Sequence, residues 1–188
     1  MIKLRNVTKS FSGKKVLDGF SLELEEGGRL LISAPSGRGK TTLLAIMMGL
    51  TLPDSGSVSG VPQRIAAVFQ EDRLPDDLTP VACVRMTAAR SVTRERIIKE
   101  LAGLGLSDCA EQKVRTLSGG QKRRVAVVRA LICDFDILFL DEPFTGLDTE
   151  TKKCVCEYIN RHTQGKTLVC VSHGEDDAKL LNCKSLRI

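Results

Sequence analysis

No stretch of the sequence is apolar for long enough to cross a membrane as a helix. The longest such stretch, residues 41–52, follows a lysine and falls short of the roughly 20 apolar residues that a spanning helix needs. Residues 1–5 run straight into an alternating strand pattern and show no features of a cleavable signal segment. The sequence therefore predicts a protein that stays in the cytoplasm.

Signals for zinc and nucleic-acid binding are also missing. The seven cysteines are scattered and lack the paired spacing of zinc ligands, so we expect buried free thiols in a reducing compartment. The net charge of +5 is mild. No basic stripe interleaved with aromatic residues accompanies it, since aromatics make up only 4% of the chain. We therefore expect a solvated surface and no nucleic-acid partner.

Apolar residues are plentiful enough for one substantial core. With 188 residues and 42% hydrophobic composition, the chain is expected to form one domain or two small lobes. Alternating apolar and polar residues at 2–8 and 20–24 indicate half-buried antiparallel strands. Further along, short apolar segments alternate with helical patterns, which is typical of a parallel α/β sheet. The helical pattern after Thr42 is expected to stop at Gly49, with Pro-Asp-Ser-Gly beyond it at residues 53–56.

The most informative segment joins a short apolar strand to a glycine-rich turn and a helix. The strand is followed, in the register of G-x-x-x-x-G-K-[ST], by Gly37, Gly39, Lys40 and Thr41. In such a segment, backbone N–H groups and the helix N-terminus bind phosphate, while Lys40 adds a positive charge and Thr41 a hydroxyl suited to Mg²⁺. Ala34 stands where the pattern has glycine. The segment predicts a phosphate site, against the alternative of a turn that only connects a strand to a helix.

Polar side chains follow three other expected strands at the point where each strand ends. They are Gln70 after residues 65–69, Asp141 and Glu142 after 136–140, and His173 after 167–171. Because ligands bind at the carboxyl ends of parallel strands, these side chains are expected beside the phosphate loop. Of two adjacent carboxylates, one could hold a hydrated Mg²⁺ and the other polarise an attacking water. A surface turn carrying two acids is the alternative.

Residues 71–116 show the pattern of an inserted helical lobe, with Thr79 and Pro80 opening a short helix. After it, Ser118 and Gln121 have capping-box spacing at the start of a helix. The two residues between them are glycines, which have no side chains to cover the first N–H groups of this helix. This start is a second place that can receive an anion. The helix is expected to carry a cationic face of Lys122, Arg123, Arg124 and Arg129. Asp148 is expected to cap the next helix.

Together these segments resemble the ATP-binding subunit of ABC transporters almost from end to end. The matching motifs are residues 34–42 as Walker A, Gln70 as the Q-loop, 117–121 (LSGGQ) as the signature, 136–141 with Glu142 as Walker B and catalytic glutamate, 146–148 as the D-loop, and His173 as the switch histidine. Walker A alone occurs in many families, whereas LSGGQ followed by an apolar-Asp-Glu-Pro string and Ser-His is specific.

The resemblance implies an α/β fold with a P-loop NTPase core of mainly parallel sheet. A small N-terminal antiparallel β subdomain would adjoin this core, and a helical subdomain over roughly residues 71–130 would be inserted in it. The whole chain, 1–188, would form a single ATP-binding domain without a C-terminal regulatory domain.

The resemblance also implies ATP and Mg²⁺ as ligands and assigns roles to single residues. Phe11, which the pattern alone leaves open between a core residue and a stacking ring, would stack on adenine. The phosphates would be wrapped by Ser36, Gly37, Arg38, Gly39, Lys40, Thr41 and Thr42. Mg²⁺ would be held by Thr41, Gln70 and Asp141. Hydrolysis would rest on Glu142, which polarises the attacking water, together with His173, Gln70 and Lys40.

Each nucleotide site would be completed by a second subunit, most simply another copy of the chain in a head-to-tail dimer. The contributing residues would be Ser118, Gly119, Gly120 and Gln121 of the signature and Asp148 of the D-loop. An integral membrane permease would dock near residues 70–78 and hold the protein at the inner face of the cell membrane. Residues 69–75 resemble the Q-loop of nitrate, sulfonate and taurine importer ATPases.

Two other functions stay open at this point. One is a soluble ABC ATPase outside transport, although neither coiled-coil heptads nor a second cassette is present in the sequence. The other is a nucleotide-binding regulatory module with little turnover. It is suggested by Ala34, whose Cβ could strain the loop or narrow the approach to phosphate.

Overall fold

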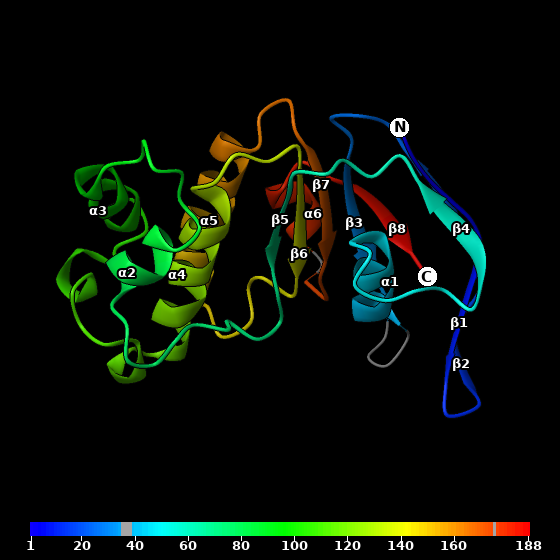
Figure 1. Ribbon diagram of the computed structural model, residues 1–188, viewed down its shortest axis with the longest axis horizontal. Helices are drawn as coiled ribbons and strands as arrows, with labels where there is room; N and C mark the ends of the chain where they lie inside the picture. Colours follow the sequence, from blue (N-terminus) through cyan, green and yellow to red (C-terminus); the bar gives the residue numbers. More distant parts are fainter. Residues whose placement is uncertain (35–38, 175) are drawn as a thin grey trace.

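Two sheets and a helical lobe follow one another along the long axis of the molecule (Figure 1). The computed structural model describes residues 1–34, 39–174 and 176–188. The small sheet lies at one end, the main sheet in the middle and the helical lobe at the other end. Within the described ranges, no helix is long and apolar enough to span a bilayer.

The main sheet has five strands in the order β5-β6-β7-β3-β8, and every neighbouring pair is parallel. The strands are β3 (Arg29–Ser33), β5 (Ile65–Val68), β6 (Ile137–Asp141), β7 (Thr167–Val171) and β8 (Lys184–Arg187). β6 and β7 are buried along their whole length, as expected for central strands covered on both faces. The predicted parallel α/β core is confirmed.

Each face of the main sheet packs into a different hydrophobic cluster. Along β6, Ile137 and Phe139 point to the cluster that contains helix α1 (Lys40–Met47) and the small sheet. Leu138 and Leu140 point to the cluster that contains the helical lobe and α5 (Thr149–His162). This alternation is the period-2 pattern of a strand, and it places apolar side chains on both faces of the sheet.

The small sheet is antiparallel, in the order β2-β1-β4. Its strands β1 (Ile2–Phe11) and β2 (Lys14–Leu24) pair as a hairpin, and they contain the predicted strands 2–8 and 20–24 but extend further toward the turn between them. The third strand, β4 (Ser55–Ser59), was not predicted. β4 has one apolar residue, Val58, and forms by pairing its backbone with β1, which its own sequence does not signal.

The helical lobe contains α2 (Pro80–Arg85), α3 (Arg94–Ala102) and α4 (Gly119–Leu131), with short 3₁₀ turns at Ser107–Cys109 and Val114–Thr116. Thr79 caps α2, and Pro80 is its first residue, as predicted. A last short helix, α6 (Asp177–Leu180), precedes β8. The subdomain limits of roughly 71–130 stay a prediction.

The seven cysteines are free thiols, and four of them are buried. Burial raises the pKa of Cys156 to about 12 and that of Cys183 to about 11, so both thiols stay protonated at neutral pH. Among the described residues, no group of histidine, cysteine and acidic side chains has the arrangement of a metal site. Buried free thiols were expected, but Cys133 and Cys183 are only half-buried and Cys154 is exposed.

Candidate functional site

The turn between β3 and α1 ends at a residue that only glycine fits. Gly39 has a φ of +80°, and a Cβ there would lie 2.7 Å from both Cγ1 and the carbonyl oxygen of Val16. The predicted phosphate residues Ser36, Gly37 and Arg38 lie outside the described residues. Val16 comes from β2, so the small sheet presses directly against the start of α1.

Lys40 is buried at the head of α1, and its ammonium group lies close to three other groups. Nζ donates to the carbonyl oxygen of Ala34 at 2.7 Å, and it lies 3.5 Å from Oε1 of Glu142. It also lies 2.9 and 3.0 Å from Nε2 and Nδ1 of His173. Ala34, within the described part of the chain, does not have a positive φ, so its Cβ brings no left-handed backbone strain.

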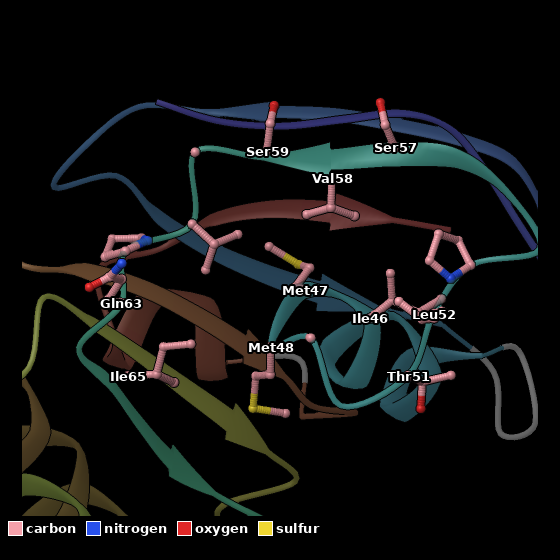
Figure 2. A pocket seen from close by; sticks show the side chains of 15 residues that line it. Ile46, Met47, Met48, Thr51, Leu52, Ser57, Val58, Ser59, Gln63 and Ile65 are labelled. Atoms are coloured by element: carbon pink, nitrogen blue, oxygen red, sulfur yellow. The ribbon is translucent and has the colours of Figure 1, made fainter.

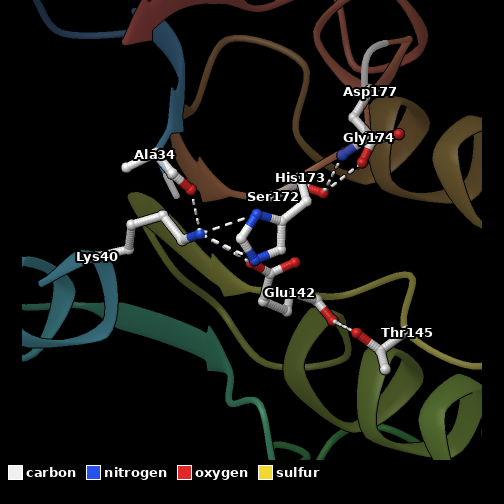
Figure 3. A network of polar contacts seen from close by, with 8 residues as sticks. All are labelled: Ala34, Lys40, Glu142, Thr145, Ser172, His173, Gly174 and Asp177. Carbon is white, nitrogen blue, oxygen red and sulfur yellow. Dashed lines mark hydrogen bonds and ion pairs between the residues drawn. The ribbon is translucent and has the colours of Figure 1, made fainter. Parts of the chain in front are cut away.

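Glu142 and His173 meet over this lysine (Figure 3). Oε1 of Glu142 lies 2.8 Å from Nε2 of His173. The Lys40–Glu142 contact is an ion pair by distance, and Oε1 of Glu142 accepts no hydrogen bond of directed geometry. Three residues predicted from separate motifs therefore converge at one point.

The backbone of Glu142 is strained, which marks the turn after β6 as specialised. Its φ is +48°, in the left-handed region that a residue with a side chain rarely adopts. The turn is fixed by hydrogen bonds from the Glu142 N–H to the carbonyl of Val171 at 2.9 Å and from the Thr145 hydroxyl to the Glu142 carbonyl at 3.2 Å. Neighbouring strand β7 and the following turn thus determine where this carboxylate points.

Asp141 is the last residue of β6 and has the character of a cation ligand. Its side chain is 4% exposed, and its Oδ1 is buried without a hydrogen-bond partner. Burial raises the pKa of this carboxyl, while a hydrogen bond from Thr41 and the charges of Lys40 and Arg123 oppose the rise. A buried carboxylate oxygen with no partner, beside a threonine hydroxyl, fits a divalent cation that prefers oxygen ligands.

A pocket of about 310 Å³ opens over these groups. It is lined by Gly39, Lys40, Thr41 and Thr42 of the loop and α1, by Gln70 after β5, by His173 after β7 and by Val16. Of the four polar residues expected at the strand ends, Gln70 and His173 line this pocket beside Lys40, whereas Asp141 and Glu142 are not part of its lining. Gln70 itself is exposed, so its side chain is free to reach a ligand.

A larger cavity, of about 570 Å³, lies elsewhere, between the end of α1, β4 and the segment leading to β5 (Figure 2). Its walls are mainly apolar, with Met47, Val58 and Ile65 among them. None of its lining residues is charged, and its only hydroxyl groups are those of Thr51, Ser57 and Ser59.

Phe11 lies at the end of β1 and does not line the pocket. It is 50% exposed, so it is not a core residue, and Lys9 Nζ lies 5.4 Å from the centre of its ring. An exposed ring at the tip of a hairpin can contact a flat ligand, but whether it stacks on adenine stays a prediction.

The signature residues form the start of α4 with the expected geometry. Gln121 N–H donates to Ser118 Oγ at 3.2 Å, and Ser118 N–H donates to Gln121 Oε1 at 2.8 Å, which completes the predicted capping box. A Cβ added to Gly119 would meet nothing within 4 Å. Ser118, Gly119, Gly120 and Gln121 do not line the pocket around Lys40 in the same chain.

Asp148 caps α5 as predicted. Its carboxylate accepts from the N–H of Thr151 at 2.9 Å and from the hydroxyl of Thr151 at 2.7 Å. These hydrogen bonds lower the pKa of the Asp148 carboxyl. The side chain is exposed, so a contact with a second subunit is sterically open.

The cationic face predicted for α4 is wrong in part, because its arginines bind backbone rather than solvent. Arg123 is 5% exposed and donates to the carbonyl oxygens of Phe69, at 2.6 Å, and Gln70. Arg129 donates to the carbonyls of Asp72 and Arg73 at 2.9 and 2.7 Å. The signature helix therefore holds the segment that contains Gln70, a link that residue spacing alone does not reveal.

The chain is similar in sequence to known ATP-binding proteins of transport systems. The sequence pattern described as ABC transporter matches residues 17–145. An aliphatic sulfonates import ATP-binding protein of Rhodococcus jostii is 39% identical over 182 residues, covering 94% of this chain and 67% of that protein. The lipoprotein-releasing system ATP-binding protein of Bacteroides thetaiotaomicron is 38% identical, covering 96% and 93%.

A solved structure shares the fold. It is an ATP-binding cassette in a dimeric post-hydrolysis state bound to ADP and Pi, with a TM-score of 0.83 and 29% identity over 96% of this chain and 91% of the other.

Proposed function

The chain belongs to the ATP-binding cassette family of ABC transporters, and from that premise we propose that it is the subunit that hydrolyses ATP to drive transport through a membrane permease. The observation that supports this best is the convergence of Lys40, Glu142 and His173 at the carboxyl edge of the main sheet. A nucleotide phosphate there would meet one ammonium, one imidazole and one carboxylate from three separate elements.

The proposed chemistry is phosphoryl transfer from ATP to water, which needs mainly positioning and charge stabilisation. Lys40 would bind phosphate oxygens in place of its present contacts with Glu142 and His173. Glu142, freed from that pair, would accept the proton of the attacking water. His173 would contact the terminal phosphate. The strained turn at Glu142 keeps the carboxylate over the pocket while this exchange of partners occurs.

We propose Mg²⁺ as the cation of this site, held by Thr41, Gln70 and Asp141. The unpaired, buried Oδ1 of Asp141 and the nearby Thr41 hydroxyl support this set. When bound, the cation would neutralise charge on the phosphate oxygens during transfer. The raised pKa of Asp141 fits the same role, because a buried carboxyl without its cation binds a proton more readily.

The signature residues would serve the nucleotide of a second copy of the chain. Ser118 and Gly119 are exposed, and neither lines the pocket of its own subunit. An uncovered helix N-terminus favours a negatively charged ligand. The solved cassette of the same fold is dimeric. These points support a head-to-tail homodimer around two ATP molecules, with Asp148 at the interface and Phe11 against each adenine.

A permease is the proposed membrane partner, docked near residues 70–78 at the inner face of the cell membrane. The relatives support a transport role, since they are named as ATP-binding proteins of sulfonate import and lipoprotein release. Their names span different cargoes, so the proposal extends to transport and leaves the cargo open. The alternative of a regulatory module with little turnover would gain support if Ala34→Gly raised a parental ATPase rate close to zero.

The test of this function is ATP turnover by Glu142→Gln beside the parent chain. We expect kcat to fall by about 100-fold or more, because a general base is lost, while ATP still binds at the Lys40 site. Glu157→Gln, on the exposed face of α5, is the matched control and should keep parental turnover. Parental turnover by Glu142→Gln would show that Glu142 is not the base.

A further inference from the structure

Asp177 is a buried carboxylate directly behind the histidine loop. It is the first residue of α6, it is 1% exposed, and its Oδ2 accepts a hydrogen bond from the hydroxyl of Ser172. Ser172 is itself 4% exposed and immediately precedes His173. Asp177 is therefore a buried carboxylate that does not itself belong to the ATP and Mg²⁺ residues proposed above (Figure 3).

The loop is built closely around this carboxylate. Gly174 N–H points to the Ser172 hydroxyl at 3.4 Å, and Asp177 N–H donates to the Gly174 carbonyl at 3.3 Å. A Cβ on Gly174 would lie 2.5 Å from both carboxylate oxygens of Asp177, so glycine is required for the approach. Ser172 and Gly174 flank His173, and both of them are held by Asp177 directly or through one hydrogen bond.

A cation from another helix completes the arrangement. Lys152 of α5 forms an ion pair with Oδ1 of Asp177, and its Nζ lies 5.4 Å from the centre of the Phe144 ring. Lys152 N–H donates to the carbonyl of Asp148 at 2.9 Å, one helical turn earlier. Phe144 follows Glu142 by two residues. Through Lys152, the histidine loop is thus connected to the turn after β6 and to the capped start of α5.

We propose that Asp177, paired with Lys152, is a positioning residue that fixes His173 over Glu142 and Lys40. A buried ion pair contributes little net stability because desolvation offsets the attraction, so fixing one arrangement is the better account of why a charge is buried here. His173 has a side chain that is 49% exposed, and its contacts in the pocket alone would leave it mobile. The catalytic consequence rests on the function proposed above.

The chain offers a direct readout, because it contains only two histidines. His162 lies on α5, where Nδ1 is 2.9 Å from the Tyr158 carbonyl and Nε2 is 3.2 Å from Glu100, away from Asp177. Ring signals of both histidines are recorded by NMR in the nucleotide-free parent, in Asp177→Asn and in Lys152→Met. We expect the His173 signal to shift and broaden in both variants while the His162 signal stays unchanged. Lys152→Arg should restore the parental His173 signal.

The kinetic arm measures ATP turnover of the same variants. Asp177→Asn should lower kcat by about tenfold, since a small misplacement of a catalytic group is costly, with KM for ATP within about twofold of the parent. An unchanged His173 signal together with parental kcat would overturn the proposal. Equal shifts of both histidines would indicate general unfolding, and Ser172→Ala, which removes only the connecting hydroxyl, then decides: a shifted His173 signal beside an unchanged His162 signal supports the proposal, and an unchanged His173 signal overturns it.

The two proposals fail in different ways. If the His173 signal responds as expected but Glu142→Gln keeps parental turnover, the proposed function is wrong and the structural role of Asp177 stands. If Glu142→Gln loses turnover but Asp177→Asn changes neither the His173 signal nor kcat, the positioning role is wrong.

Discussion

Replacing Arg123 by methionine tests how firmly the signature helix holds the segment around Gln70. The guanidinium is buried and donates to two backbone carbonyls, those of Phe69 and Gln70. Its Nε lies 3.2 Å from Oδ1 of Asp72. Methionine fills much of the same volume, so the cost comes from lost polar contacts. Breaking a buried pair costs about 3–5 kcal/mol, and partial exposure of Asp72 favours the lower end, so we expect about 3 kcal/mol.

The loss should depend on pH. Burial raises the pKa of Asp72, and Arg123 is the foremost charge that opposes this rise. In Arg123→Met the folded-state pKa of Asp72 therefore lies further above its unfolded value. Folding then favours the protonated carboxyl, and the variant loses stability as pH rises through that folded-state pKa. The difference in unfolding free energy between parent and variant should accordingly shrink as pH falls from 7.

The assay is urea denaturation of the parent, Arg123→Met and Lys122→Met. Lys122 is the neighbouring residue of the same helix, and its Nζ lies 3.9 Å from Asp76 in a pair open to solvent. Removing such a surface pair should change the unfolding free energy by less than about 1 kcal/mol. If Arg123→Met were no more destabilising than Lys122→Met, the contacts of Arg123 with the Gln70 segment would not contribute to the unfolding free energy.

Two further predictions concern the loop and a helix cap. Gly39→Ala should weaken ATP binding and lower the melting temperature, because the new Cβ would lie 2.7 Å from Val16. Gly13 has a similar φ of +79° but open space around it, so Gly13→Ala measures the cost of the backbone conformation alone. Equal losses of melting temperature in the two variants would show that the contact with Val16 has no effect. Asp148→Asn should be less stable than the parent near neutral pH and approach the parent below pH 3.8. The pKa of Asp148 is lowered in the folded state, so its stabilising contribution is present above the ordinary pKa of 3.8 and is lost as pH falls through the folded-state pKa. A difference in urea midpoints that does not change with pH would contradict this.

The parallel core and the phosphate site could be predicted because their signals are local. The strand at residues 136–140 is apolar and short, and the turn to α1 carries Gly39, Lys40 and Thr41 in sequence. Parallel strands then bring their carboxyl ends to one edge, which explains why Gln70 and His173 share a pocket with Lys40. The two capping residues, Ser118 and Asp148, were also predictable, since a helix cap depends on side chains within three residues.

The remainder depends on partners that are distant in sequence. β4 exists because β1 offers its backbone to Ser55–Ser59. From its helical position Arg123 is expected on the surface, but the fold buries it against the carbonyl oxygens of Phe69 and Gln70. Asp177 lies in a polar stretch near the C-terminal end, and only the fold buries it against Ser172 and Lys152. In each case, backbone groups or charges of another element determine whether the strand forms or the side chain is buried.

Whether two copies of the chain share each nucleotide site is best tested by sedimentation velocity of Glu142→Gln with ATP and Mg²⁺, alone and combined with Gly119→Glu. A side chain at Gly119 meets open space in the single chain, so the second change should leave folding and ATP binding intact. It would, however, place a carboxylate against the partner's phosphates. If two copies share each site, Glu142→Gln will be a dimer and the double variant a monomer. Dimerisation of both to the same extent would contradict it.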